Sequence, residues 1–376
     1  MRILISTMLE DIHAIAVATS LEQRGHDVVR LHHADFPTRQ RVNLEYTGAT
    51  LSATMAGSAL SDIDPRDFDV VWNRRHIPAR SDQTVNPDDR EFARRETRAA
   101  SAALWQLCGP AAFWINPEPA AQRAQVKPVQ LAAAQRHGLA VPPTLISNDP
   151  ARVREFVQRH AGVCVYKPLS MGDWFEDGNL HMLYTSKVDV AQLPTDRLLQ
   201  ACPGIYQRRV DKHYEVRATF MGAQCCAIRI DSQQTERGQV DWRQAQGSER
   251  MPARPVEAPA AVQAACRALM TELGIVFGCF DFIVTPEGEW VFLEVNEAGQ
   301  FLFLEVWCPE LPLLDMFCQF LLSRDTAFRY RTGATPLRYP ADIEAGALER
   351  INATDRAAHV DTNVWQSMTV ALKAAS

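Results

Sequence analysis

A segment near residue 280 constrains the fold more than any other part of this 376-residue chain. Residues 277–296 contain two apolar runs, FGCFDFIV and WVFLEVN, separated by the polar sequence TPEGE. Two such runs around a turn that contains Pro and Gly are typical of a hairpin. Acidic side chains are depleted in strands, so Asp281 and Glu294 need a specific reason to be there. We therefore predict an antiparallel hairpin whose polar residues form a site.

Successive side chains of a strand point to opposite faces, which predicts the neighbours in this hairpin. On the first strand, one face is expected to carry Phe280, Phe282 and Val284, and the other face Asp281 and Ile283. On the return strand, a single face is expected to carry Trp290, Phe292, Glu294 and Asn296. An even-length loop centred between Glu287 and Gly288 places Asp281 directly opposite Glu294, with Cβ atoms about 4.5–5.5 Å apart. Asn296 then lies one pleat further along the same side.

Two carboxylates held this close repel each other and destabilise a bare hairpin. A hard cation offsets the repulsion, and two carboxylates with one amide oxygen suit Mg²⁺, which completes its shell with water and phosphate oxygens. The alternative is a solvent-facing strand with scattered acids, against which the surrounding apolar residues count. We therefore predict a metal site formed by Asp281, Glu294 and Asn296.

The composition limits the class of protein. Hydrophobic residues make up 47% of the chain and charged residues 22%, an ordinary globular mixture for two or three packed lobes. The net charge of −6 gives no basic field, so neither nucleic acid nor a membrane is expected as a partner. Glu10 and Asp11 interrupt the short apolar start, which argues against a secretory signal. Nine cysteines without a CxxC pair indicate thiols in a reducing cytoplasm.

The beginning of the chain predicts a small doubly wound sheet. Residues 2–7 read as a strand, 11–24 as a helix that ends at Gly25, and the run to Leu31 as a second strand. No GxGxxG follows the first strand, so a dinucleotide fingerprint is absent. The later strand FDVVW leads into Asn73, Arg74 and Arg75. The expected domains are residues 1–118, a central lobe 119–203, an antiparallel-sheet lobe 204–328 and a tail 329–376, and the fold class is α/β with α+β.

Two lysines are candidate phosphate ligands. Lys127 lies at the start of a predicted helix, where helix N–H groups also favour anions. Lys167 ends the apolar strand VCVY, directly before a loop that contains two glycines. Loop amides can close over phosphates while the ammonium reaches them. For each lysine the alternative is a solvated surface charge.

The segment IYQRRVDKHYEVR predicts a strand, a bend and a second strand. Backbone groups around Arg208 and Val210 could meet adenine edges, and Glu215 could accept from ribose hydroxyls. The alternative for Glu215 is an exposed glutamate of the meander. Arg217, Arg229 and Arg243 lie on or beside the same predicted sheet, and phosphoryl transfer needs fixed positive charge. Arg229 in CCAIRI needs an anionic partner if it points into a sheet face, and otherwise faces solvent on an edge strand.

The order of these motifs resembles the ATP-grasp superfamily. The resemblance covers about residues 1–325. The motifs that support it are, in order, K127-x-x-x-L131 before Gly138 and VPPT, then VYKP, YQRRV with YEVR, AIRIDS with DWR, and FDFIV with FLEVNEAGQ. The chain is most similar to the graspetide synthetases of the microviridin type, ligases that macrocyclise ribosomal peptides. FDVVWNRR resembles a strand-plus-arginine feature of that branch. The resemblance implies an ATP-grasp fold with an N-terminal pre-ATP-grasp lobe, a central lobe and a C-terminal antiparallel-sheet lobe.

The resemblance also implies roles for individual residues. Lys127 and Lys167 would hold the ATP phosphates, and the 170–178 loop with Ser170 and Gly172 would be a lid. Gln207, Arg208 and Val210 would line the adenine, and Glu215 would take the ribose. Asp281, Glu294 and Asn296 would bind Mg²⁺. Arg229, with Arg217 or Arg243, would stabilise the acyl-phosphate transition state. Asn73 and the pair Glu297-Ala298 depart from the family pattern, as do Phe301 and the tail beyond 330.

The resulting hypothesis is an ATP-dependent ligase that activates Asp or Glu side chains of a ribosomal precursor peptide and closes ester or amide rings. A leader segment would dock on the enzyme, and Arg74, Arg75, Arg208 and Arg209 could favour an acidic core. A homodimer is compatible with the sequence. The alternatives are an intermolecular ligase that adds a free amino acid to a peptide or protein, and a non-catalytic nucleotide- or peptide-binding module.

Overall fold

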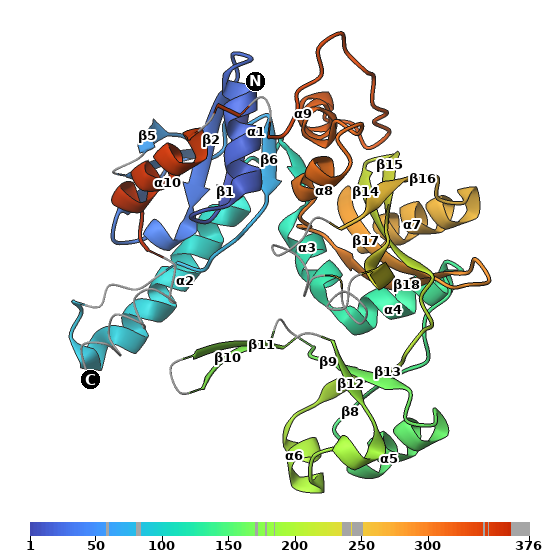
Figure 1. The fold of residues 1–376 in the computed structure, drawn as a ribbon. Coiled ribbons are helices and arrows are strands. Elements are labelled where there is room, and N and C mark those ends of the chain that lie inside the picture. Colours follow the sequence, from blue (N-terminus) through green and yellow to red (C-terminus); the bar gives the residue numbers. More distant parts are fainter. Residues whose placement is uncertain are drawn as a thin grey trace. The chain divides into compact units, whose positions relative to one another are not determined.

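The computed structural model describes residues 1–57, 60–79, 84–169, 172–176, 179–183, 185–234, 242, 251–340, 343–344 and 346–361. Two compact units form. The first contains Met1–Glu118 together with the described residues from Pro312 onward, and the second contains Pro119–Leu311. Figure 1 shows the elements of each unit.

The first unit is built on a parallel sheet. Its strand order is β2-β1-β6-β7, where β1 is Arg2–Thr7, β2 Asp27–His32, β6 Val70–Asn73 and β7 Phe113–Ile115. Helix α1 (Ile12–Glu22) connects β1 to β2, and Asp11 caps it by accepting from two backbone N–H groups. The predicted opening βαβ unit is thereby confirmed. Helix α2 (Arg90–Leu107) and the antiparallel strands β3 (Gln40–Thr47), β4 (Thr50–Gly57) and β5 (Leu60–Ile63) complete this part.

The end of the chain returns to the first unit. Helix α9 (Leu313–Ser323) packs against α1, and its Phe317 and Phe320 rings contact Trp72 and Phe113, with centroids 4.6 and 5.8 Å apart. The apolar surface of the parallel sheet therefore takes up α9. The chain divides after Glu118 and again before Pro312, so the described residues from Pro312 onward belong to the first unit.

Helix α10 (Ala347–Ala358) docks on the same unit through charged pairs. Arg30 on β2 makes a bidentate contact with Asp355: Nη1 donates to Oδ2, and Nη2 donates to Oδ1 at 2.9 Å. His359 shares a hydrogen bond with Asp35 (Nδ1 to Oδ2, 2.6 Å), and its ring stacks on His32 at 3.7 Å. Arg39 donates to the His359 carbonyl at 2.7 Å. The polar tail thus completes the N-terminal domain.

The second unit contains two main antiparallel sheets. The smaller one has the order β12-β9-β13-β8, with β8 Thr144–Ser147, β9 Cys164–Lys167, β12 Ser186–Val188 and β13 Gly204–Arg208. Helices α5 (Pro150–Arg159) and α6 (Asp196–Ala201) pack with it around a small apolar core. A separate hairpin joins β10 (Gly172–Glu176) to β11 (Asn179–Leu183). Helix α3 (Glu118–Gln125) begins at the division between the units.

The larger sheet has five antiparallel strands in the order β16-β15-β14-β17-β18. They are β16 Ala253–Val256, β15 Gln224–Ile230, β14 Tyr214–Met221, β17 Phe277–Val284 and β18 Trp290–Asn296. Helices α4 (Lys127–Arg136) and α7 (Ala260–Leu273) pack on one face, which we call the core face because Phe280, Phe282 and Phe292 are buried there. The opposite face is here called the polar face. Helix α8 (Leu302–Trp307) follows β18 in sequence. Three strands, at 204–210, 214–221 and 224–230, are predicted to form an antiparallel meander. The pairing of the last two is confirmed as β14 with β15, whereas the first is wrong as a member of this sheet, because β13 pairs with β8 and β9 in the smaller sheet.

The predictions about thiols and membranes can be compared with the described residues. All nine cysteines lie in the described part of the chain, where none is joined in a disulfide, and seven are buried. Burial raises the pKa of the Cys108 thiol to about 12, which disfavours a reactive thiolate. Among the helices of the described residues, none has the length and apolar character that crossing a bilayer requires.

We predict that Asp355→Ala weakens the first unit. Arg30 would be left with an uncompensated charge at a site where the Asp355 side chain is only 5% exposed. Breaking such a pair costs about 3 kcal/mol, which lowers the unfolding midpoint by roughly 5–10 °C. Thermal unfolding with Glu349→Gln, an exposed acid on the same helix, as the control measures the effect. Equal midpoints for the two variants would contradict the docking described for α10.

We also predict that acid destabilises the first unit through His32. Burial, and then the neighbouring His359 and Arg30 charges, lower the pKa of His32 to about 4, against the opposing effect of Asp355 and Asp35. The unfolded chain therefore binds the extra proton between pH 6.5 and 4, and stability falls across that window by up to about 3 kcal/mol. His32→Phe keeps a ring against His359 but cannot titrate. Urea unfolding at several pH values should show a flatter profile for this variant, and identical profiles would refute the assignment.

Candidate active site

The register of β17 and β18 determines the geometry of the candidate site. Asp281 pairs directly with Glu294, and Cys279 pairs with Asn296. The predicted opposition of the two carboxylates is therefore present. Beyond this point Phe282 pairs with Phe292, so Leu293 is an extra residue and forms a β-bulge.

The bulge corrects part of the sequence prediction. The turn is centred on Glu287 rather than between Glu287 and Gly288, because Val284 pairs with Trp290. Trp290 and Phe292 consequently lie on the core face, opposite to Glu294 and Asn296, instead of sharing a face with them. A two-residue period without a bulge cannot produce this change of face. The bulge therefore keeps the aromatic residues in the core while it aims Glu294 at Asp281.

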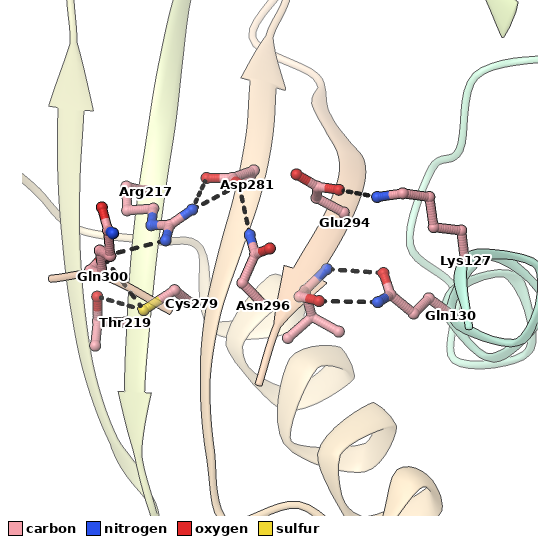
Figure 2. A network of polar contacts seen from close by, with 10 residues as sticks. Lys127, Gln130, Arg217, Thr219, Cys279, Asp281, Glu294, Asn296 and Gln300 are labelled. Carbon is pink, nitrogen blue, oxygen red and sulfur yellow. Dashed lines mark hydrogen bonds and ion pairs between the residues drawn. The ribbon is translucent and has the colours of Figure 1, made fainter. Parts of the chain in front are cut away.

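A compact polar network surrounds Asp281 on the polar face (Figure 2). Arg217, the cross-strand neighbour on β14, donates from Nη1 to both carboxylate oxygens of Asp281, at 2.8 and 2.7 Å. Asn296 donates from Nδ2 to Asp281 Oδ2 at 3.0 Å. Arg217 also donates from Nη2 to the Gln300 carbonyl at 3.1 Å. Three predicted site residues thus meet around one carboxylate.

The close approach of the Gln300 segment depends on Gly299. A Cβ atom at this position would lie 2.6 Å from Cys279 Sγ and 3.1 Å from Arg217 Nη2. Contacts this short would displace the sulfur or the guanidinium. Gly299 therefore allows the chain after β18 to fold back over Arg217.

Two cations balance the two carboxylates in this network. Arg217 is buried, and although burial lowers its pKa, the charges of Asp281, Cys279 and Glu294 and the hydrogen bonds with Asp281 raise it overall. Lys127 Nζ donates to Glu294 Oε2. The repulsion predicted between Asp281 and Glu294 is therefore offset by protein side chains: within the described part of the chain, Arg217 lies on Asp281 and Lys127 on Glu294.

Lys127 reaches Glu294 around the outer edge of the sheet. Helix α4 contributes Ala133 and Ala134 to the core face, whereas Glu294 lies on the polar face. The first turn of α4 therefore brings the lysine past edge strand β18. The predicted position of Lys127 at a helix start is confirmed, and the structure adds its partner.

Glu215 lies further along the same face. It pairs with Ile283 on β17, two residues from Asp281, and is buried. Its Oε1 accepts from Lys212 Nζ at 2.9 Å and from Ser232 Oγ at 2.8 Å. The alternative of an exposed glutamate is thereby excluded.

Lys167 and Gln207 meet on the smaller sheet. Lys167 Nζ donates to Gln207 Oε1 at 2.9 Å, and Gln207 Nε2 donates to Thr144 Oγ1 at 2.9 Å. Gln207 is buried, whereas Arg208 and Arg209 are exposed and Val210 is half-buried. Lys127 therefore contacts the predicted metal ligand Glu294, whereas Lys167, at the end of β9, contacts Gln207 on β13, the strand predicted to line adenine.

Arg229 is not part of the polar-face network. It pairs with Val216, which in turn pairs with Phe282, and both of these are buried on the core face. Its guanidinium contacts Asp231 (Nε to Oδ1, 2.7 Å) and lies 3.9 Å from the centre of the Tyr214 ring. The need for an anionic partner is met by Asp231. Directly paired strand residues share a face, so Arg229 lies on the face opposite to Arg217 and Asp281, and the structure does not bring it together with Arg217.

The remaining predicted residues differ in their outcome. Arg74 is 2% exposed and its Nε lies 3.1 Å from Asp11 Oδ2, so its charge is used inside the first unit instead of on the surface. This corrects its assignment as an exposed peptide-binding arginine. Arg75 is half-buried and stays a candidate. Gly172 begins β10, whose backbone alone is described, and both Ser170 and Arg243 lie outside the described residues.

Comparison with known proteins identifies the class to which this fold and polar network belong. Residues 2–122 match the MvdD pre-ATP grasp domain. An ATP-grasp ligase of Chryseobacterium gregarium, described as RiPP-associated and in complex with ADP and a leader and core peptide, superposes with a TM-score of 0.78 at 24% identity, covering 86% of this chain and 97% of that chain. A search of curated protein sequences gave no significant match. The chain has the ATP-grasp fold, and the C. gregarium protein is described as an ATP-grasp ligase.

Two further similar structures are of proteins described as macrocyclases. The macrocyclase MdnC of Microcystis aeruginosa MRC, bound with precursor peptide MdnA, has a TM-score of 0.74 at 25% identity and covers 86% of this chain and 100% of that chain. The macrocyclase MdnB of the same organism has a TM-score of 0.70 at 28% identity, covering 85% and 99%. The resemblance to graspetide synthetases, inferred from the motif order, is thereby confirmed.

The donor set around Asp281 fits a magnesium ion. Asp281, Glu294 and Asn296 present two carboxylates and an amide on one face of adjacent strands, and oxygen donors of this kind suit Mg²⁺. Among the described residues, no group of three or more His, Cys, Asp or Glu side chains is placed to hold a metal ion. The carboxylates' present partners, Arg217 and Lys127, are side chains that a metal and phosphates can replace in part.

Several residues of the site were missed by sequence reasoning. They are Gln130 on α4, Thr144 beside Gln207, and Lys212 and Ser232 beside Glu215. Each is a single polar residue whose partner lies on another element, so no local pattern marks it. The exception is Lys212, which stands three residues before Glu215 in the predicted bend.

We predict opposite effects of Lys127→Met on metal and nucleotide. Removing the ammonium leaves Glu294 unbalanced, so nucleotide-free Mg²⁺ binding should tighten by about tenfold, because the site becomes more negative. ATP binding should weaken by about 10- to 100-fold through loss of a charge-assisted contact. Calorimetric titration with each ligand separates the two effects. Lys187→Met, at an exposed position on β12, is the control; weaker binding of both ligands would contradict the counter-charge role of Lys127.

Proposed function

We propose that this ligase uses ATP and Mg²⁺ to activate carboxylate side chains of a ribosomal precursor peptide and joins them to hydroxyl or amine groups of the same peptide. The observation that supports the proposal most is the opposed pair Asp281 and Glu294 with Asn296 beside it and Lys127 and Arg217 around it. The similarity to the macrocyclases MdnB and MdnC supports the peptide as the substrate class.

The proposed reaction has two balanced steps. A carboxylate oxygen of the peptide attacks the γ-phosphorus of ATP, the bond from this phosphorus to the β,γ-bridging oxygen breaks, and ADP leaves. The resulting acyl phosphate then reacts with a hydroxyl or amine, which loses a proton and displaces inorganic phosphate. An ester or an amide closes the ring.

The residues of this chain have distinct roles in the proposal. Asp281, Glu294 and Asn296 would hold Mg²⁺, which neutralises phosphate charge when it is bound. Lys127 and Lys167 would bind the phosphates, and Arg217 would keep Asp281 oriented while adding fixed positive charge. Gln207 and the backbone at Arg208 and Val210 would line the adenine, and buried Glu215 would accept from the ribose.

The peptide is proposed to bind as a leader followed by an acidic core. The C. gregarium ligase is described with both a leader and a core peptide, and MdnC with its precursor. Among the arginines first considered for an acidic core, Arg75, Arg208 and Arg209 are half-buried or exposed, so they stay in the proposal. A homodimer and a cytoplasmic location stay predictions.

Addition of a free amino acid to a peptide or protein is the second enzyme hypothesis. A non-catalytic binding module is disfavoured, because Asp281, Glu294, Asn296 and Lys127 are all present in one network. Mass spectrometry distinguishes the two reactions. Ring closure removes one water for each bond, whereas ligation adds the mass of a residue.

We predict that ADP release requires both Mg²⁺ and a precursor peptide. Asp281→Ala and Glu294→Ala should each abolish ADP release, since each removes a carboxylate of the proposed Mg²⁺ site. Glu287→Gln, an exposed acid in the turn of the same hairpin, should turn over like the wild type. Peptide-independent ADP release, or full turnover by the two alanine variants, would contradict the proposal.

A further inference from the structure

The outer edge of β18 is closed by a side chain instead of a strand. β18 ends the five-stranded sheet, so the backbone groups on its outer side have no strand partner among the described elements. Gln130 of α4 fills one of these positions. Its Oε1 accepts from the Val295 N–H at 3.0 Å, and its Nε2 donates to the Val295 carbonyl at 2.9 Å (Figure 2).

The bulge at Leu293 makes this contact possible. The N–H of Phe292 also points outward and donates to the Ala140 carbonyl at 2.8 Å. In a regular strand the outward groups recur at every second residue, which would give positions 292, 294 and 296. With the extra residue Leu293, the next outward position is Val295. The same bulge that aims Glu294 at Asp281 therefore presents Val295 to Gln130.

Gln130 connects the two elements that carry opposite charges of the site. It lies one turn after Lys127 on α4, and Val295 lies between Glu294 and Asn296 on β18. Its side chain is 3% exposed, and its Nε2 also donates to the Ala124 carbonyl. The uncharged amide supplies both the donor and the acceptor that the Val295 backbone requires, which an ionised carboxylate cannot.

From this geometry we infer that Gln130 is a positioning residue. Its amide fixes the first turn of α4 against β18, and so sets the position of the Lys127 ammonium relative to Glu294 and Asn296. The consequence for the reaction is that affinity for the metal–nucleotide complex depends on a residue that touches neither ligand. This consequence rests on the proposed function, whereas the two hydrogen bonds between Gln130 and the Val295 backbone do not.

The test combines two variants with two measurements. Gln130→Met keeps the length of the side chain but removes both hydrogen bonds. Hydrogen exchange at the Val295 amide should accelerate, and calorimetric affinity for Mg²⁺ with ADP should fall about tenfold or more, as for other residues that support metal ligands. Circular dichroism and the unfolding midpoint establish that the variant is folded under the conditions used.

Gln130→Glu provides a rescue. A carboxylate lacks the donor, but a protonated carboxyl group presents an O–H and a carbonyl oxygen to Val295. Because burial raises the pKa of a carboxyl group, lowering the pH should restore Mg²⁺–ADP affinity relative to the wild type at the same pH. A residue that only stabilises the fold would change the folded fraction without changing the affinity of the folded protein.

The control is Gln263→Met. Gln263 on α7 donates from Nε2 to the Ala258 carbonyl at 2.8 Å, so it is another helix glutamine bonded to backbone, and its hydrogen-bond partners Ala258 and Arg267 lie outside β18. It should bind Mg²⁺–ADP like the wild type. Unchanged exchange at Val295, or unchanged affinity, in folded Gln130→Met would overturn the inference. Failure of the wild type to bind Mg²⁺–ADP would instead refute the proposed function. Hydrogen exchange at the Val295 amide would still decide whether Gln130 is bonded to it.

Discussion

The direct opposition of Asp281 and Glu294 is the constraint on which the rest of the site depends. Two carboxylates on paired strand positions cost free energy unless positive charge compensates them. Arg217 and Lys127 supply it, from β14 and from α4, and Asn296 adds a donor to Asp281. Because the side chains that compensate the negative charge come from three elements, the packing of the strands and of α4 is directly coupled to the charge of Asp281 and Glu294.

One backbone irregularity reconciles the needs of the core with those of the site. Without the bulge at Leu293, a single face of β18 would have to carry both Trp290 and Phe292 and the ligands Glu294 and Asn296. With it, the aromatic residues join Phe280 and Phe282 in the core while the ligands face Asp281. The bulge also turns Val295 outward to Gln130. Strand irregularities next to active sites commonly redirect side chains in this way.

Much of this architecture could be predicted from the sequence, and the errors have physical causes. Alternation within 277–296 identified the carboxylate pair, but a period of two cannot reveal a bulge, so the faces of Trp290 and Phe292 were wrong. The face of Arg229 could have been derived from the sequence: Met221 and Gln224 close β14 and β15 through Gly222-Ala223, and this register puts Arg217 and Arg229 on opposite faces. Gln130 could not be found, because its partner lies 165 residues away. The docking of the tail likewise depends on pairs such as Arg30 with Asp355.

An experimental structure of the protein with ADP and Mn²⁺, in which Mn²⁺ replaces Mg²⁺ as an anomalous scatterer, tests the central claim most directly. An anomalous peak is expected between Asp281 and Glu294, with Asn296 next to it and the Lys127 ammonium moved from Glu294 to a phosphate oxygen. A metal bound elsewhere, with Lys127 still on Glu294, would contradict this assignment.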